Sequence, residues 1–139
     1  MKQGITFFAL LALLLHPLWA QIQKVGNQGF IDWNKREITA TGIGAPNPDM
    51  PAVTARPMAL QAARTIALRN ALEVIKGIHL TSNTTVENYM ISSDVVSKNV
   101  QGFIRSFKES KPKYMSDKTI EVSVTIPMDN KFSETLLAQ

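Results

Sequence analysis

The sequence contains no cysteine, and histidine is nearly as scarce. Without cysteine the chain has no disulfide, no thiolate ligand for a metal and no thiol nucleophile. A lipid anchor at a signal cleavage site is excluded too, because that modification requires a cysteine. His79 is the one histidine outside the apolar N-terminal segment, so a metal site built on a histidine pair is excluded. Nothing in the spacing brings a serine and an acid to His79, as a catalytic triad requires.

The acidic side chains form no clear catalytic or metal-binding pattern. Asp49, Glu87, Asp94 and Asp117 stand far apart and make no calcium-binding loop. Glycoside cleavage would require Glu87 and Asp94 to meet across a deep cleft, for which a chain of 139 residues has little volume. We therefore expect no metal and no cofactor. A small secreted hydrolase that uses Glu87 and Asp94 stays open as the alternative.

A phosphate-binding loop is also missing. The stretch "TATGIGAPNP" carries Gly42 and Gly44, but prolines follow and the next helical pattern starts about ten residues later. A dinucleotide-binding turn needs its glycines to lead directly into a helix, and a Walker loop needs Gly-Lys-Ser/Thr. We interpret this stretch as the end of a strand, where the glycines permit close chain approach or a bulge.

Residues 1–20 are typical of a secretory signal peptide. A positive start at Lys2 precedes an apolar run over residues 5–15, and Ala20 offers a small residue for cleavage. The run is shorter than the roughly 20 residues that span a bilayer. An uncleaved anchor is the alternative. We expect a periplasmic or secreted protein with one domain over residues 21–139, whose core covers about residues 30–128.

The strongest pattern in the first half of the chain is a helix rich in alanine. Residues 30–33 and 36–41 predict a hairpin around Asn34-Lys35, and three prolines in residues 45–51 predict a rigid loop. The helix is expected over residues 58–76, with Thr54 as its cap, Pro57 in its first turn and Gly77 as its stop. Its apolar face centres on Leu60, Ala63, Ala67, Ala71 and Val74.

The second half predicts two more strands and one short helix. Residues 78–86 are rich in β-branched side chains and indicate a strand, and Ser92 or Ser93 could cap a helix over residues 94–100. Residues 119–126 alternate strictly and would pair with residues 103–114 through a turn at 116–118. Residues 129–139 show too little pattern for an assignment. The expected fold class is α+β, a small antiparallel sheet with one long helix packed across it and a second short helix.

A few polar side chains fall at positions that need explanation. Arg64 lies within the apolar arc of the helix and Asn70 near its edge, so each needs a hydrogen-bond partner if it is covered. We also predict that Glu87 and Asn88 have a structural role between the third strand and the short helix. A candidate basic patch consists of Arg105, Lys108, Lys111, Lys113 and Lys118.

The basic patch has two interpretations. It could contact a polyanion, a membrane surface or an acidic partner, or it could be a charged sheet edge that prevents aggregation. The net charge of +4 and the few aromatic side chains argue against a nucleic-acid binder.

Four stretches, "IDWNKREITATGIGAP", "ARPMALQAARTIALRNALEVIKGI", "TSNTTVENYMISSDVVSKNVQGFI" and "KTIEVSVTIPM", together resemble the family of the twenty-kilodalton outer-membrane lipoprotein. They are also similar to the amino-terminal domain of FlgT, a flagellar basal-body accessory protein. The most recognisable positions are Thr85-Val86-Glu87-Asn88 and, on the helix, Arg64, Arg69 and Asn70. Founding members carry a lipidated cysteine, which this chain lacks, so we expect a soluble periplasmic protein.

The resemblance implies a small envelope domain without known catalysis that acts by association. Our leading hypothesis is therefore an exported, non-enzymatic cell-envelope protein that contacts another envelope protein or itself. The alternatives are the small hydrolase and a periplasmic module that binds polyanions through residues 108–118.

Overall fold

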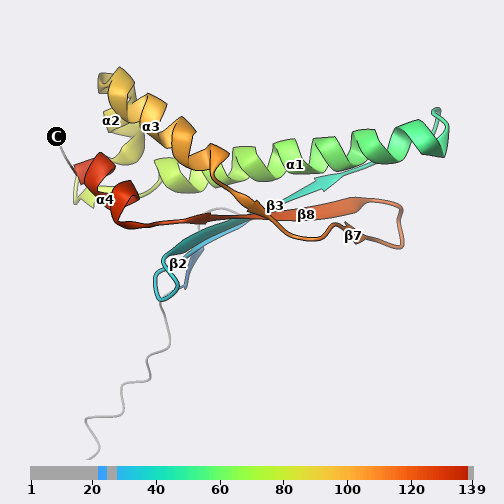
Figure 1. The fold of residues 1–139 in the computed structure, drawn as a ribbon, viewed down its shortest axis with the longest axis horizontal. Helices are drawn as coiled ribbons and strands as arrows, with labels where there is room; N and C mark the ends of the chain where they lie inside the picture. Colours follow the sequence, from blue (N-terminus) through green and yellow to red (C-terminus); the bar gives the residue numbers. More distant parts are fainter. Residues whose placement is uncertain (1–21, 25–27, 138–139) are drawn as a thin grey trace, which may run out of the picture.

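The computed structural model describes residues 22–24 and 28–137, so the predicted signal peptide lies outside the described residues. The described part forms two layers (Figure 1). One layer is an antiparallel sheet, and the other is the long helix α1 (Ala52–Lys76) along one face of it. The shorter helices gather near the C-terminal end of α1, which leaves its N-terminal end and the adjoining strand ends free. This confirms the predicted α+β class.

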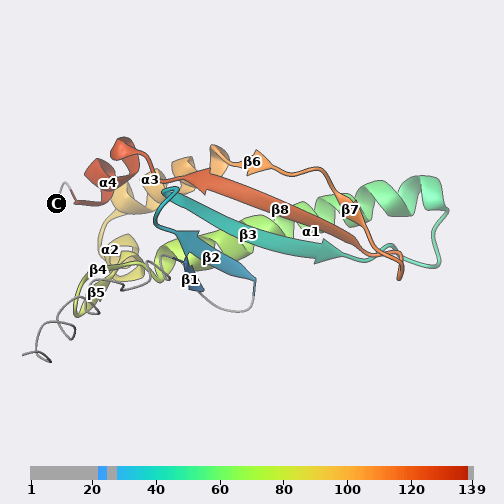
Figure 2. The ribbon, with the colours of Figure 1, turned by 90° about the horizontal axis from the view of Figure 1, so that it is seen from below.

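The main sheet joins strands from both ends of the chain. The N-terminal strands are β1 (Ile22–Lys24), β2 (Gly29–Asp32) and β3 (Glu37–Gly44), and the C-terminal ones are β6 (Lys108–Glu109), β7 (Lys113–Tyr114) and β8 (Ile120–Pro127). Their order is β1-β2-β3-β8-β6, and β7 also pairs with β8 (Figure 2). The longest ladder joins β3 to β8 and runs from Glu37 opposite Pro127 to Gly44 opposite Ile120.

The predicted hairpin between β2 and β3 is present, with a longer turn than expected. Asp32 pairs with Glu37, and Asn34 and Lys35 lie in the loop between them. The Asp32 carboxylate accepts hydrogen bonds from the backbone N–H groups of Asn34 and Lys35, each at 3.0 Å. Arg36 completes the turn with a φ of 53°.

The apolar stripe of α1 lies on the sheet as its periodicity predicts. Alanines every four residues, from Ala55 to Ala71, are buried together with Val74 and Ile75. Leu60 is only partly buried. On the strands beneath α1, every second residue is buried. Ile38 and Ala40 of β3 and the four alternating apolar residues of β8 therefore face the helix.

The start of α1 corrects the predicted one. The helix begins at Ala52 after Pro51, whose carbonyl accepts from the N–H groups of Thr54 and Ala55, and there is no side-chain cap. Thr54 is therefore within the helix and not its cap. Pro57 lies past the first turn, where its missing N–H leaves the Val53 carbonyl without its usual donor. Gly77 ends the helix, as predicted.

The two glycines of "TATGIGAPNP" explain how closely α1 approaches the sheet. A Cβ at Gly42 would lie 2.1 Å from the Ala63 carbonyl oxygen, and one at Gly44 would lie 2.0 Å from that of Ala59. Contact at such range is possible only without a side chain on the strand. The predicted role of these glycines in close chain approach is confirmed.

The segment after α1 differs most from the prediction. Instead of one strand over residues 78–86, β4 (His79–Thr81) and β5 (Thr84–Thr85) form a separate small hairpin. Helix α2 (Val86–Ser92) was not predicted. Ser93 caps α3 (Asp94–Arg105) as expected, but the helix continues past the exposed Gly102, and Phe103 and Ile104 pack against the core.

The C-terminal part contains two further corrections. Residues 103–105 belong to α3, so only β6 and β7 of the predicted partner strand pair with β8. The turn at residues 116–118 is confirmed: the Lys118 N–H donates to the Met115 carbonyl. The last element is α4 (Asn130–Leu137), which buries Phe132 and Leu136 four residues apart. Within residues 22–24 and 28–137, no helix is long and apolar enough to cross a membrane.

Candidate functional site

The candidate hydrolase residues lie at the end of the molecule that carries α2 and α3. Glu87 is in the first turn of α2, and Asp94 is the first residue of α3. Both are exposed, as is His79 on β4. The Glu87 carboxylate lies 3.8 Å from the Lys76 ammonium, which makes a surface ion pair. No group of three or more histidine or acidic side chains suited to a metal occurs among the described residues.

Arg64, which was expected to need a hydrogen-bond partner, is paired with Glu109. Its guanidinium donates two hydrogen bonds to the Glu109 carboxylate, with 3.0 Å between Nη2 and Oε1, and a third to the Gln61 side chain. The bond from Arg64 holds the pKa of Glu109 below its usual value. This pair ties edge strand β6 to α1. Arg64 therefore has a structural contact here.

Asn70 is also explained by its hydrogen bonds. Its side-chain amide donates to the Thr41 carbonyl at 2.7 Å and to the Gln28 side chain at 2.9 Å. Residue 41 lies just past the ladder between β2 and β3, where its N–H still donates to the Gln28 carbonyl, and the Asn70 amide supplies the donor for the Thr41 carbonyl. Arg69, the neighbouring candidate on α1, is exposed.

Asn88 closes the start of α2. Its side-chain oxygen accepts from the N–H and the hydroxyl of Thr85, both at 2.9 Å, and its own N–H donates to the Thr85 hydroxyl. This reciprocal arrangement is a capping box. Asn88 therefore has a structural contact at the start of α2.

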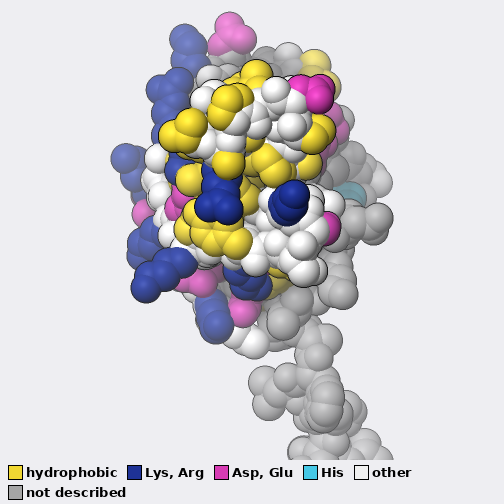
Figure 3. All heavy atoms as spheres, turned by 90° about the vertical axis from the view of Figure 1, so that its right-hand side faces the viewer, with side chains coloured by type: hydrophobic (Ala, Val, Ile, Leu, Met, Phe, Trp, Pro, Cys, Tyr) yellow, Lys and Arg dark blue, Asp and Glu magenta, His cyan; other side chains and the backbone are white. Residues whose placement is uncertain are grey.

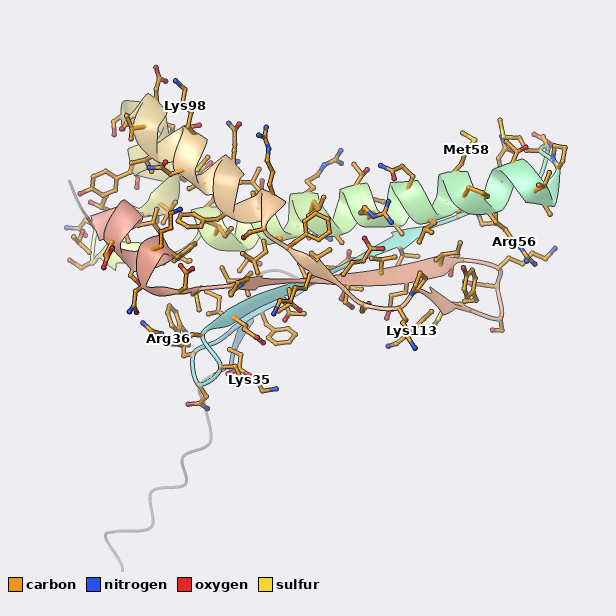
Figure 4. All side chains as sticks on the ribbon, viewed as in Figure 1. Lys35, Arg36, Arg56, Met58, Lys98 and Lys113 are labelled. Carbon is orange, nitrogen blue, oxygen red and sulfur yellow. The ribbon has the colours of Figure 1, made fainter. Side chains whose placement is uncertain are left out.

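The residues of the candidate basic patch come from several different elements. Arg105 ends α3, Lys108 and Lys113 lie on separate edge strands, and Lys113 contacts Glu121 at 3.2 Å. Figure 4 shows Lys113 below the sheet, on the side away from α1. Lys111 and Pro112 interrupt the edge between the two strands, which protects it against pairing with another chain. Polyanion binding stays a prediction.

Lys118 belongs to a different feature, a pocket at the free end of the molecule. The pocket has a volume of about 750 Å³. The position of the pocket follows from the strand register, because β3 ends at Gly44 opposite Ile120, the first residue of β8. The loop after β3, the start of α1 and the turn before β8 therefore meet there. We call this the end pocket. Its lining consists of Ala45, Pro46, Asn47, Pro48, Met50, Ala52, Ala55, Arg56, Tyr114, Met115, Asp117, Lys118 and Ile120.

Large apolar side chains are concentrated around the end pocket. Met50, Tyr114 and Met115 line it and are exposed, and Val53 in the first turn of α1 is 82% exposed. Figure 3 shows apolar side chains over much of this end, with cationic side chains among them. Exposed apolar groups gathered in one place are typical of a binding surface.

The charges of the end pocket are two cations and one acid. The Asp117 carboxylate accepts from the hydroxyl and the N–H of Thr119, at 2.6 and 3.0 Å, and these bonds lower its pKa. Asp117 is therefore ionised and held in the turn. Arg56 and Lys118 take part in none of the ion pairs of the described residues.

The sequence contained only partial signals for the end pocket. Its two loops were predicted as a proline-rich loop and a turn, and Lys118 was included in the basic patch. Met50, Arg56, Tyr114 and Met115 were not identified as site residues. The exposure of Met50 and Met115 depends on the register that brings the two loops together.

A second, smaller pocket lies beside α3 and α4. Its volume is about 320 Å³, and its polar lining includes Lys98, Asn99, Asp129 and Lys131. Glu87, Asp94 and His79 line neither of these two pockets.

Comparisons with protein-family models, with curated proteins and with solved structures found no match.

Proposed function

We propose that this chain is an exported, non-enzymatic cell-envelope protein that acts by association, and that its free end makes the contact. The observation that carries the proposal is the end pocket, with exposed Met50, Tyr114 and Met115 beside two cations. Burying such apolar groups against a partner is favourable at about 25 cal/mol per Å². The sequence supplies the rest: a predicted signal peptide and a resemblance to envelope domains that act by association.

Site-directed photo-crosslinking tests this proposal in cells. A benzophenone amino acid placed at position 114 is expected to give a discrete adduct in the envelope fraction. The matched control places it at Ile91, which is 80% exposed at the opposite end. An adduct of twice the chain mass would identify self-association, and a different mass would identify another protein. Equal crosslinking from both positions, or none from position 114, would refute the role of the free end.

The rival hydrolase has a separate test. If Glu87 were catalytic, Glu87→Ala would abolish an activity without changing the unfolding curve. We expect no activity to depend on Glu87, because its carboxylate is exposed and 3.8 Å from Lys76. A screen of the purified protein with ester and glycoside substrates checks this. Hydrolysis that disappears in Glu87→Ala alone would favour the enzyme.

A further inference from the structure

The walls of the end pocket are held in place by hydrogen bonds that need no ligand. On one side, the Met50 N–H donates to the Asn47 carbonyl at 3.2 Å, and Pro46 and Pro48 restrict the same loop. On the other, the Met115 N–H donates to the Thr119 carbonyl at 2.9 Å. A pocket that is formed before binding loses less conformational entropy when it is filled.

The lining of the end pocket has two chemical parts. Methionine, proline and tyrosine side chains form an apolar part, and methionine adapts its shape to an irregular or flexible ligand. Arg56 and Lys118 are the cationic residues of the lining. Arg56 lies at the free end of α1, whereas Met58 projects from the side of the helix away from the sheet (Figure 4). A ligand that satisfies both parts is apolar along its length and carries an anionic group.

We infer that the end pocket binds a single-chain amphiphile, with its acyl chain against Met50 and Met115 and its anionic head at Arg56 and Lys118. The volume of about 750 Å³ lies within the usual range of roughly 300–1,000 Å³ for small-molecule sites. Arg56 and Lys118 take part in none of the ion pairs of the described residues, and with one carboxylate, Asp117, against these two cations the lining keeps a net positive charge for the head group. This inference rests on the proposed function, since it names what the same free end accepts.

Binding of dodecanoate to the purified protein, below the concentration at which it forms micelles, is the direct test. Calorimetry would give the Kd, and methionine-methyl NMR would show which methionine side chains contact the bound dodecanoate. We expect the methyl signals of Met50 and Met115 to shift while that of Met58 does not. Octanoate should bind at least about tenfold more weakly, because each lost CH₂ removes buried apolar surface. Dodecyl maltoside, which has the same chain and no charge, should also bind more weakly.

Variants separate the two parts of the pocket. Arg56→Gln and Lys118→Gln should each weaken dodecanoate binding about three- to fivefold, as expected for one solvent-exposed charge contact. Met115→Ser should weaken dodecanoate and dodecyl maltoside alike. The matched controls are Lys98→Gln, at the second pocket, and Met58→Ser, which removes an exposed methionine outside the lining. Neither control should change the Kd.

Each contrary result overturns a defined part of the inference. Equal binding of dodecanoate and dodecyl maltoside would refute the role of the cations. Binding only to phosphatidylglycerol vesicles, without binding to monomeric dodecanoate, would refute a pocket ligand in favour of a membrane-surface contact. Specific crosslinking at position 114 without dodecanoate binding would refute the inference and leave the proposed function standing. The reverse pattern would refute only the proposed association.

Discussion

Replacing Gly42 by alanine tests how the fold is held together. Gly42 lies on β3 beneath α1, where the helix backbone passes directly over the strand. An alanine Cβ would lie 2.1 Å from the Ala63 oxygen and 2.3 Å from the Ala67 nitrogen. Both are backbone atoms, so no side-chain rotation can relieve the overlap. The helix would have to move by more than about 1 Å to restore normal contact distances.

The cost of that movement follows from the packing beneath α1. Shifting the helix separates buried alanines from Ile38, Val122 and Val124. Overpacking typically costs about 1–3 kcal/mol, and an overlap with backbone atoms places this substitution at the upper end, about 3 kcal/mol. For a domain of this size the midpoint of thermal unfolding should fall by about 10 °C. No positive φ requires glycine at position 42, so the loss would report the contact alone.

Urea and thermal unfolding followed by circular dichroism measure this effect. Gly102→Ala is the matched control, because a Cβ at Gly102 meets nothing within 4 Å and the residue lies inside α3. That variant should be more stable by about 0.5–1 kcal/mol, since alanine favours the helix. The two substitutions should therefore act in opposite directions. A Gly42→Ala protein as stable as the unmodified chain would refute the close packing of α1 on β3.

Three further substitutions probe the polar contacts. Asn70→Ala should cost about 1–3 kcal/mol in urea unfolding, because it leaves the strand carbonyl that the amide satisfies without a donor; unchanged stability would contradict that role. Arg64→Gln should destabilise the protein at pH 7 and have less effect near pH 3. The folded-state pKa of Glu109 is lowered, so the stabilisation by the pair is present above the unfolded pKa of about 4.3 and is lost as the pH falls through the folded one. An equal effect at both pH values would exclude this linkage. Asn88→Ala should cost about 1 kcal/mol by opening the capping box, whereas Glu87→Ala should change stability by less than about 0.5 kcal/mol. The opposite ranking in thermal unfolding would show that the capping box is unimportant.

The longer elements could be predicted because an element with one buried face repeats its apolar residues at a regular spacing along the sequence. Residues 119–126 alternate at every position, and the alanine stripe of α1 repeats every four residues, so β8 and α1 follow from periodicity alone. Short elements carry too few repeats for such a pattern. The β4–β5 hairpin therefore looked like one strand over residues 78–86, because threonines favour strands but also cap helices, and α2 was not predicted. Among the side chains of α4 that the structure describes, two apolar positions are buried, Phe132 and Leu136.

The candidate residues also divide into those with a local sequence signal and those whose partners lie far along the chain. The need of Asn70 for a partner could be recognised because a polar side chain near a covered face has few local options. The capping box of Asn88 with Thr85 was not predicted, because α2 itself was not predicted. The partner of Arg64 could not, since Glu109 lies on a strand far along the chain. The end pocket could not be predicted either, because its parts follow β3 and precede β8, which lie far apart in the sequence and meet only through the β3–β8 ladder.

The sequence by itself determined the elements with strong periodicity and the absence of thiol chemistry. Each of these depends on a residue's own chemistry or on its near neighbours. Only the tertiary structure decided that β3 pairs with β8 and that a proline-rich loop, the start of α1 and a distant turn enclose one pocket. Pairing between strands that are far apart in the chain is set by the best total burial of both faces, which no local pattern contains.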